Sequence, residues 1–388
     1  MQEETTAVGY DTALNEEQLA VRNLARDFAE SEIRPVVMEY DESQEFPAGI
    51  FRKMAELGFL GITVPTELDG SGLGFVEYAL IVEEIARIDP SMALGVAAHN
   101  GLCTGHIFRF GSDELKQKYV PRLARGETMG AWGLTEPGSG SDAGGMQTVA
   151  RRDGNEWVIN GSKNFITHGT VGDIAVVMTV TDREAGANGI TAFVVDKSMP
   201  GFYASKKENK LGMRCSDTSS LVFEDVRVPA ENMIGKEGEG FKQALQILDG
   251  GRISIAALSV GLAQGALDAA LKYSNERRQF GRRIADFQAI QFKLAMMATE
   301  VEAARLMTYK AAYMRDRGQD FAIEASKAKY FASEVSVRCA LEAVQIHGGY
   351  GYIKEYPVEK YYRDAKLLTI GEGTSEIQKI VISRSLLR

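Results

Sequence analysis

One carboxylate of the sequence stands where general-base chemistry would be expected. Glu372 lies between Gly371 and Gly373 in the segment TIGEGTSEIQ, directly before a predicted helix start that Thr374 or Ser375 would cap. A carboxylate on such a turn can project into a cavity, and a ligand that excludes water would raise its pKa toward neutrality, where it could accept a proton. The alternative is a structural role, because an acidic side chain is also favourable near a helix N-terminus.

A glycine-rich segment could bring the backbone close to a bound group. Residues 138–145, GSGSDAGG, contain the G-x-G-x-x-A spacing of a dinucleotide-binding turn. That motif needs a strand before it and a helix after it, whereas a β-rich region follows here, so we reject a nicotinamide-binding fold. The segment then predicts either close approach to a ligand, with Thr135, Ser139 and Ser141 nearby, or a tight loop entering a β domain.

Two further segments could contact a ligand. ERRQFGRR, residues 276–283, gathers four arginines, whose guanidinium groups suit phosphate oxygens, although a solvated turn between helices explains them equally well. HGGYGY, residues 347–352, contains three glycines. One glycine would end a helix, and the excess predicts backbone packed against another group.

Composition excludes several classes of function. The 388 residues include 44 basic and 53 acidic side chains, a net charge of -9, so no overall nucleic-acid or anionic-membrane footprint is expected. Three widely spaced cysteines indicate reduced thiols, and the four histidines form no metal motif, so no metal is expected. No run approaches the roughly 20 apolar residues of a membrane span. The acidic start MQEETTAVGYD lacks the features of a signal peptide, which predicts a cytoplasmic protein in a bacterium, or a processed mitochondrial matrix protein in a eukaryote.

The elements that must position these groups follow the order helical, β, helical, with boundaries near residues 127 and 237. The first 125 residues are predicted to be mostly helical, with a helix N-cap at Asn15 and Gln18 three positions on, in the spacing of a capping box. Residues 146–228 are rich in β-branched runs with Asp-Gly or Asn-Gly signals, which predict an antiparallel sheet or small barrel. The hairpin signals lie at 153–154, 160–161 and 188–189.

The last part of the chain predicts an antiparallel helical bundle. No proline occurs between residues 230 and 356, and apolar residues there recur at three- and four-residue spacing. Four long helices are predicted, at 241–273, from 290 on, at 322–345 and at 367–387.

Eight segments occur in the order found in the acyl-CoA dehydrogenase family, which the chain resembles over essentially its whole length. They are AWGLTEPGSGSDAGG, WVINGSKNFITHG, KLGMRCSDT, ILDGGRISIAA, ERRQFGR, EAVQIHGGYGY, EYPVEKYYRDAK and GEGTSEIQ. Within the family the chain is most similar to short/medium- or broad-chain bacterial and mitochondrial enzymes of the butyryl-CoA dehydrogenase type. The resemblance implies an N-terminal α-helical domain (1–127), a central antiparallel β-barrel (128–237) and a C-terminal four-helix bundle (238–388), in a homotetramer that is a dimer of dimers.

The resemblance also implies a reaction. FAD-dependent members convert an acyl-CoA to the trans-2-enoyl-CoA: a base removes the α-proton, the β-hydrogen passes as hydride to flavin N5, and an electron-transferring flavoprotein accepts the electrons. The developing enolate needs donors, which the family takes from a flavin ribityl hydroxyl and the backbone N–H of the base. The alternatives are an oxygen-using, acyl-CoA oxidase-like flavoenzyme and a catalytically silent binding or scaffold protein with the same fold.

Carried over residue by residue, the resemblance makes Glu372 the base. Some members place the base at the position occupied here by Gly251, which a glycine cannot serve. The positions that match FAD contacts are Leu134, Thr135, Ser141, Phe165, Ile166, Thr167, Arg277, Gln279, Phe280, Gln288, Gln345, Ile346, Gly348, Gly349, Thr374 and Glu376. In the family, some of these contacts come from a neighbouring subunit, and they match Arg277, Gln279, Phe280, Gln288 and the 345–349 segment. The positions matching acyl-CoA contacts are Ser141, Asp249, Gly250, Gly251, Arg252 and Gly373.

Three residues depart from the family pattern. Gly371 stands where several short- and medium-chain relatives have tyrosine, which predicts a wider acyl pocket near the thioester. Phe165 replaces a common tryptophan and keeps an aromatic wall. His347 replaces an aromatic residue and is expected to pack.

Overall fold

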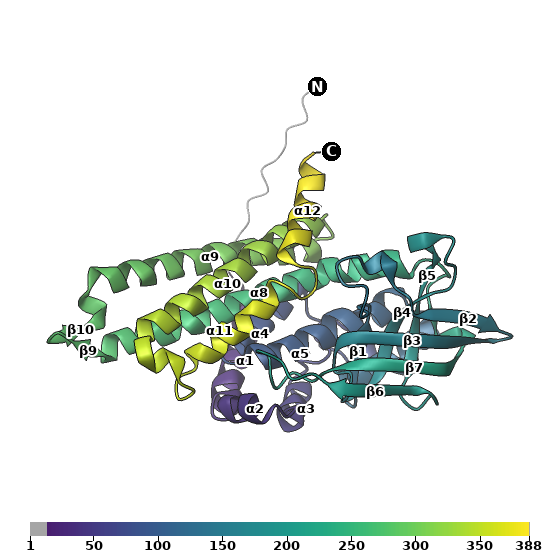
Figure 1. The fold of residues 1–388 in the computed structure, drawn as a ribbon, viewed down its shortest axis with the longest axis horizontal. Helices are drawn as coiled ribbons and strands as arrows, with labels where there is room; N and C mark the ends of the chain where they lie inside the picture. Colours follow the sequence, from purple (N-terminus) through teal and green to yellow (C-terminus); the bar gives the residue numbers. More distant parts are fainter. Residues whose placement is uncertain (1–13, 388) are drawn as a thin grey trace.

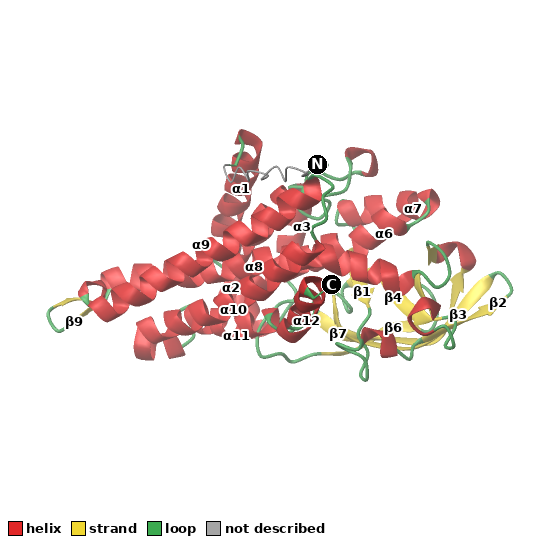
Figure 2. Ribbon diagram, turned by 90° about the horizontal axis from the view of Figure 1, so that it is seen from above, coloured by secondary structure: helices red, strands yellow, loops and turns green. Residues whose placement is uncertain are grey.

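The computed structural model describes residues 14–387, and the acidic start of the chain lies outside them. Helices form one end of an elongated molecule and a twisted sheet forms the other, with the long helix α8 (Gly240–Glu276) running between them (Figures 1 and 2).

The first helices confirm the predicted start. Asn15 Oδ1 accepts from the N–H of Gln18 at 2.8 Å, and Gln18 Oε1 accepts from the N–H of Asn15 at 3.1 Å. The helices of this part are α1 (Glu16–Phe28), α2 (Val37–Ser43), α3 (Ala48–Glu56), α4 (Phe75–Ala86), α5 (Pro90–Ala98), α6 (Gly105–Phe110) and α7 (Asp113–Ala124). A π-helical turn, His99–Thr104, joins α5 to α6.

The middle of the chain forms one open eight-stranded sheet, ordered β6-β7-β3-β2-β4-β5-β8 with β1 beside β4. Its strands are β1 (Met129–Gly133), β2 (Val149–Asp153), β3 (Glu156–Thr167), β4 (Gly172–Val180), β5 (Ile190–Asp196), β6 (Phe202–Lys207), β7 (Thr218–Pro229) and β8 (Met233–Ile234). The predicted antiparallel barrel needs correction, because the described end strands β6 and β8 do not pair with each other. Pairing is also mixed: β1 runs parallel to β4 opposite residues 172–177, and β2 begins parallel to β4 opposite Val180.

The hairpin signals had different outcomes. Asp153 pairs with Glu156 across the predicted turn at 153–154, and the 188–189 signal lies in the connection of antiparallel β4 and β5. The turn predicted at 160–161 is wrong, because Gly161 lies inside β3 at a bulge against β7. Its φ of 144° and the backbone of Thr148, 2.7 Å from where a Cβ would stand, require glycine.

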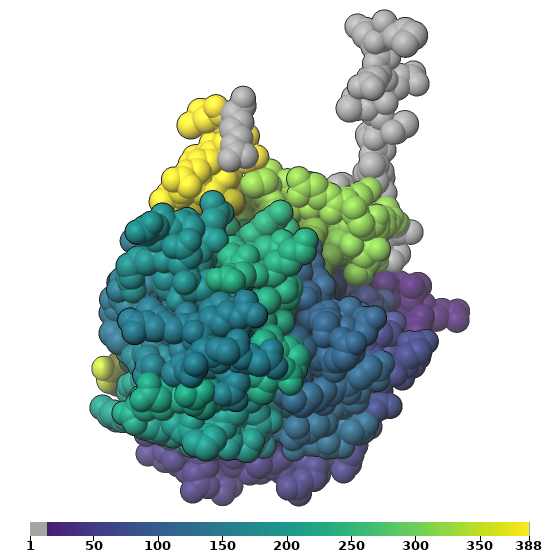
Figure 3. Space-filling view, turned by 90° about the vertical axis from the view of Figure 1, so that its right-hand side faces the viewer, coloured from purple at the N-terminus to yellow at the C-terminus, as the bar shows by residue number. Residues whose placement is uncertain are grey.

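The C-terminal helices are α8, α9 (Gln288–Asp316), α10 (Ala322–His347), α11 (Val358–Leu368) and α12 (Ser375–Leu386). The single helix predicted at 367–387 is wrong: residues 369–374 form a turn, and α12 projects from the bundle (Figures 1 and 3). The basic segment forms a short hairpin of β9 (Arg278–Gln279) and β10 (Arg282–Arg283) between α8 and α9.

Helix α8 is the central element of the core. By length and composition it could cross a membrane, but 83% of its most apolar window is buried inside the protein, as in the core helix of a globular fold. Gly261 and Gly265 allow close packing, because a Cβ at either position would overlap the backbone carbonyl of Glu83 or Arg87. This helix connects the site near Gly251 to the hairpin at the far end of the bundle.

Candidate active site

Glu372 lies in the turn between α11 and α12. Its φ is 51° and that of Gly373 is 94°, so two consecutive residues adopt the left-handed conformation. The hydroxyl of Thr374 caps α12 by accepting from the N–H of Ile377 at 3.3 Å, as one of the two predicted caps. A non-glycine residue held at positive φ is strained, which is a common feature of functional turns.

The carboxylate of Glu372 is suited to accept a proton. Its Oε2 is shielded from solvent and has no hydrogen-bond partner among the described residues. Burial raises the pKa of Glu372 to about 7, against the positive charges of Lys329 and Arg252, which act in the opposite direction. A general base with a pKa near neutrality and a free lone pair can remove a proton at physiological pH.

The glycine pair of α8 leaves room for this carboxylate. A Cβ at Gly251 would overlap Oε2 of Glu372 and lie 3.6 Å from Cδ2 of Leu102, while a Cβ at Gly250 would overlap the guanidinium of Arg315. Gly251 therefore faces the carboxylate of Glu372 directly.

Arg252, beside the glycine pair, is held by neighbours on two helices. Its Nη1 donates to Oδ1 of Asp249 at 2.6 Å and to the hydroxyl of Ser326 at 3.0 Å. The structure thus brings Asp249, Gly250, Gly251, Arg252 and the Glu372 turn together.

A small apolar cluster extends from this turn toward the sheet. Ala98, Leu102 and Ile247 are buried, and Trp132 on β1 packs against them. Because Leu102 also approaches Gly251, these side chains form an apolar wall between the carboxylate and the end of β1.

The loop after β1 is anchored by a buried ion pair. Lys163 of β3 has no solvent exposure, and its Nζ donates to Oε1 of Glu136 at 2.7 Å and to the carbonyl of Leu134 at 3.3 Å. The carbonyl of Thr135 accepts from the N–H of Asn164 at 2.8 Å. The predicted cofactor positions Leu134 and Thr135 are therefore fixed to the strand that carries Phe165.

The end of β3 offers an aromatic wall. Phe165 is 66% exposed although it is large and apolar, and its φ is 59° at a bulge of β3. Thr167 is half-buried nearby, whereas the side chain of Ile166 packs into the sheet core. Ser141 is exposed in the glycine-rich loop. An exposed ring beside a half-buried hydroxyl and a fixed loop fits the planar ring system of a flavin.

A second group of predicted residues surrounds a cavity of about 550 Å³ at the other end of α8. Arg277, Gln279, Ile346, Gly348 and Gly349 all line it. The two glycines have no atom within 4 Å of where a Cβ would stand, and an arginine beside open glycine backbone fits a phosphate-bearing ligand.

His347 and Tyr273 form an aromatic wall of the same cavity. Their rings stack with centroids 4.2 Å apart, and Nδ1–H of His347 donates to the carbonyl of Ala343 at 2.8 Å. These contacts support the packing role predicted for His347.

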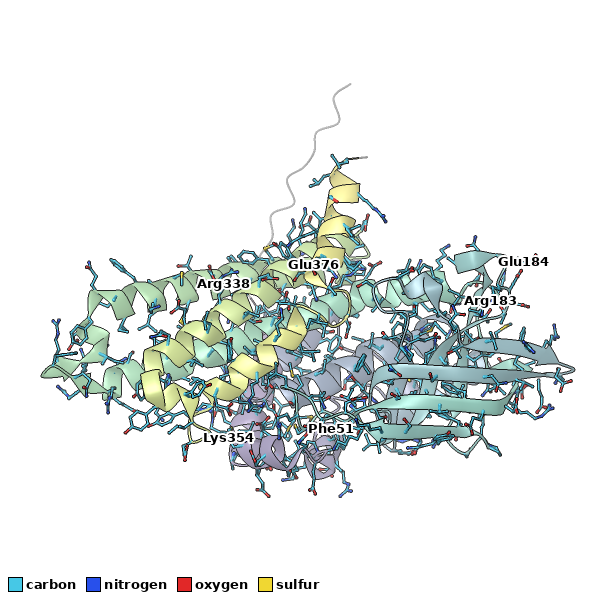
Figure 4. All side chains as sticks on the ribbon, viewed as in Figure 1. Phe51, Arg183, Glu184, Arg338, Lys354 and Glu376 are labelled. Carbon is cyan, nitrogen blue, oxygen red and sulfur yellow. The ribbon has the colours of Figure 1, made fainter. Side chains whose placement is uncertain are left out.

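Four predicted cofactor residues lie at the surface. Phe280 is 92% exposed at the tip of the β9–β10 hairpin, and Gln288 is exposed at the start of α9. Gln345 is exposed on α10, and Glu376 is exposed on α12, where it is labelled in Figure 4. Within one chain the first three are not brought to the Glu372 turn.

The two groups are too far apart for one ligand within one chain. Arg277 follows Gly251 by about 26 residues of the same helix, which corresponds to about 39 Å along its axis. An FAD molecule cannot reach from one to the other, so a single bound flavin would need these groups from two different copies of the chain.

A helical N-terminal domain, a middle sheet and a helical C-terminal domain around a buried carboxylate define the fold of the acyl-CoA dehydrogenases, which are FAD-dependent oxidoreductases. The chain belongs to this family: residues 15–127, 131–226 and 238–387 match the N-terminal, middle and C-terminal domains of acyl-CoA dehydrogenase, respectively.

Relatives of known name cover nearly the whole chain. It is 47% identical over 378 residues to the short-chain specific acyl-CoA dehydrogenase of Clostridium acetobutylicum, covering 97% of this chain and 100% of the relative. It is 47% identical over 375 residues to a subunit of the caffeyl-CoA reductase-Etf complex of Acetobacterium woodii, covering 96% and 99%. The butyryl-CoA dehydrogenase structure from Megasphaera elsdenii has a TM-score of 0.96 at 44% identity and covers 98% of this chain and 100% of that one.

Two structural features were missed by the sequence reasoning. The Lys163–Glu136 pair joins residues on different strands and loops, and no local pattern indicates it. Lys329 carries a usable signal, because it lies on the same helical face as the buried Ala325, Ala328 and Ala332, where a lysine is unexpected.

Proposed function

We propose that this chain oxidises short- to medium-chain acyl-CoA thioesters to trans-2-enoyl-CoA, with Glu372 as the base. The observation that carries the proposal is the buried, unpartnered Oε2 of Glu372, whose pKa burial raises to about 7. The carboxylate removes the α-proton, and the apolar cluster around Leu102 receives the acyl chain and excludes water. When bound, FAD supplies the hydride acceptor for the β-hydrogen.

The residues of this chain have distinct roles in the proposal. Leu134, Thr135 and Thr167 contact the flavin ring system, and Phe165 packs on it. The backbone N–H of Glu372 donates to the thioester carbonyl, where negative charge develops. Asp249 and Arg252 lie along the CoA channel, with Ser141 and Gly373 as further substrate contacts.

The proposed assembly is a homotetramer in which Arg277 and the cavity at the far end of α8 serve a neighbouring copy. The separation of about 39 Å along α8 supports this arrangement. We keep residues 1–127, 128–237 and 238–388 as the proposed domains. An electron-transferring flavoprotein is the proposed electron acceptor, in line with the Etf-complex name of the Acetobacterium relative.

Gly371 supports a broad acyl range. A Cβ there would make only ordinary contacts with Leu367, at 3.6 Å or more, so the turn has room for the tyrosine of several relatives, and glycine leaves that volume unfilled. We therefore propose that straight chains beyond butyryl and branched chains are accepted.

Anaerobic flavin bleaching tests the proposal. Butyryl-CoA or hexanoyl-CoA should bleach the wild-type protein, whereas Glu372→Gln should bind FAD and stay yellow. Rapid bleaching of that variant would show that another group is the base. Hydrogen peroxide formed without an added acceptor would instead identify an oxidase.

A second candidate is the reverse reaction, reduction of a 2-enoyl-CoA. The named similarity to a caffeyl-CoA reductase subunit favours testing it, and the same carboxylate, protonated, would return the α-proton. Flavin reduction by butyryl-CoA and reoxidation of the reduced flavin by crotonyl-CoA, with the two rates compared in one anaerobic flavin assay, determine which direction dominates.

A further inference from the structure

The side chain of Lys329 on α10 is fully buried and lies against the turn that carries Glu372. Its Nζ donates to the backbone carbonyl of Gly373 at 2.7 Å, and Nε2 of Gln378 donates to the same oxygen at 3.1 Å. Gly373 is the residue directly after the base, so two buried donors hold the left-handed end of the turn.

Lys329 lies near the Glu372 carboxylate but forms no ion pair with it. Among residues 14–387 no carboxylate lies within ion-pair distance of its Nζ, although its charge acts on Glu372. A direct ammonium–carboxylate hydrogen bond would occupy the lone pair that must take the substrate proton. Hydrogen bonding to the neighbouring carbonyl instead places the charge near Glu372 and leaves Oε2 free.

Lys329 and Arg252 are the two cations whose charges act on Glu372, whereas Arg315 of α9 lies beside Gly250 over the ring of Phe75. Arg252 on α8 is paired with Asp249. Tyr78 on α4 stays protonated, because burial raises its pKa further above the usual value. Glu334 on α10 and Glu376 on α12 act on Lys329 more weakly than Glu372 does. Lys329 is thus the cation whose main counter-charge is the base itself.

From this geometry we infer that Lys329 is a positioning residue for the α-proton abstraction: its ammonium holds the Gly373 carbonyl and compensates the Glu372 carboxylate without bonding to it. The inference rests on the proposed role of Glu372 as base. Loss of the positive charge should make the carboxylate harder to ionise, while the contacts to CoA stay unchanged.

The first test is a titration of Glu372 without substrate. The protonated-carboxyl infrared band that disappears in Glu372→Gln is followed against pH in the wild-type holoenzyme, Lys329→Met, Lys329→Gln and Lys329→Arg. The two neutral variants should raise the pKa of Glu372 by about one unit or more, and Lys329→Arg should stay close to wild type. Lys327→Met, which breaks a half-buried pair with Glu324 on the same helix, is the matched control and should cause no shift.

The second test is the rate of anaerobic flavin reduction by butyryl-CoA. The acid limb of the pH–rate profile should move to higher pH together with the infrared titration. A one-unit rise from a pKa of about 7 lowers the ionised fraction of Glu372 at pH 7 from about one half to about one eleventh, so kcat should fall about fivefold while KM changes little. The inference is overturned if Glu372 in Lys329→Met titrates at the wild-type pH. If the methionine variant does not fold with bound FAD, the same criterion applies to Lys329→Gln. It is equally overturned if Lys327→Met shifts the pKa as much.

The two proposals fail in different ways. If Glu372→Gln still reduces flavin at the wild-type rate, the assignment of the base is wrong. If Glu372→Gln is inactive but the neutral Lys329 variants titrate like wild type, only the role of Lys329 is wrong.

Discussion

A methyl group added at Gly251 should displace the base without harming the fold. The new Cβ would overlap Oε2 of Glu372 and lie 3.3 Å from its Cδ, so the carboxylate must swing away by about an ångström. Displacements of that size cost on the order of 10²-fold in rate. Alanine is favoured over glycine within a helix by about 1 kcal/mol, so Gly251→Ala should keep or raise the unfolding temperature. The expected result is a large loss of kcat in a stable, yellow protein.

The assay is dye-linked oxidation of butyryl-CoA together with thermal unfolding and flavin content. Gly49→Ala on α3, where a Cβ has open space, is the matched control and should keep wild-type kcat. If Gly251→Ala keeps kcat within about threefold, the contact between α8 and Glu372 does not position the base, and the geometric reasoning is refuted.

Further predictions concern pH, the buried ion pair and the far cavity. Because only the carboxylate form of Glu372 accepts a proton, reductive rates should fall as pH drops through the pKa of about 7, which stopped-flow bleaching would measure. Glu372 has a pKa of about 7 in the folded protein but about 4.5 in the unfolded chain, so its ionisation lowers the free energy of unfolding as pH rises from 4.5 through 7. Glu372→Gln should therefore have a higher unfolding temperature than wild type at pH 8 but not at pH 4. Lys163→Met leaves the charge of Glu136 buried and unpaired, which costs about 3–5 kcal/mol and should lower the unfolding temperature. Arg227→Met, which breaks an exposed pair, is the control and should leave the unfolding temperature unchanged. Equal unfolding temperatures for the two variants would contradict this prediction. Arg277→Ala should lower FAD retention on gel filtration by about tenfold or more, and unchanged retention would exclude its role at the far cavity.

Much of the local structure could be predicted from short patterns. The Asn15 capping box, the 153–154 hairpin turn and the helices near 241–273 and 322–345 depend on residues a few positions apart, whose propensities and periodicity are visible in the chain. The errors arose where a local signal had two outcomes. Asn160-Gly161 serves a bulge as well as a turn, and the apolar pattern at 367–387 continues across the turn that separates α11 from α12.

The open sheet shows a different limit of local patterns. The β-branched runs predict β4, but β1 lies outside the β-rich region of 146–228, and the parallel pairing of β1 and β2 with β4 joins segments far apart in the chain. The loop connecting β1 to β2 is held by Lys163 of β3, which bonds to Glu136 and to the carbonyl of Leu134, and no hairpin signal describes such a long-range contact.

The sequence by itself determined the family, the order of the elements and the acidic turn at Glu372, because these reside in contiguous motifs. Only the tertiary structure decided that Gly251 makes room for the carboxylate and that Lys329 supports the turn from below. Gly251, Lys329 and Glu372 come from three separate segments, and burial, which raises the pKa of Glu372 to about 7, exists only after those segments pack together. The chemistry of the carboxylate is thus a property of its surroundings, whereas its position in the chain is a property of the motif.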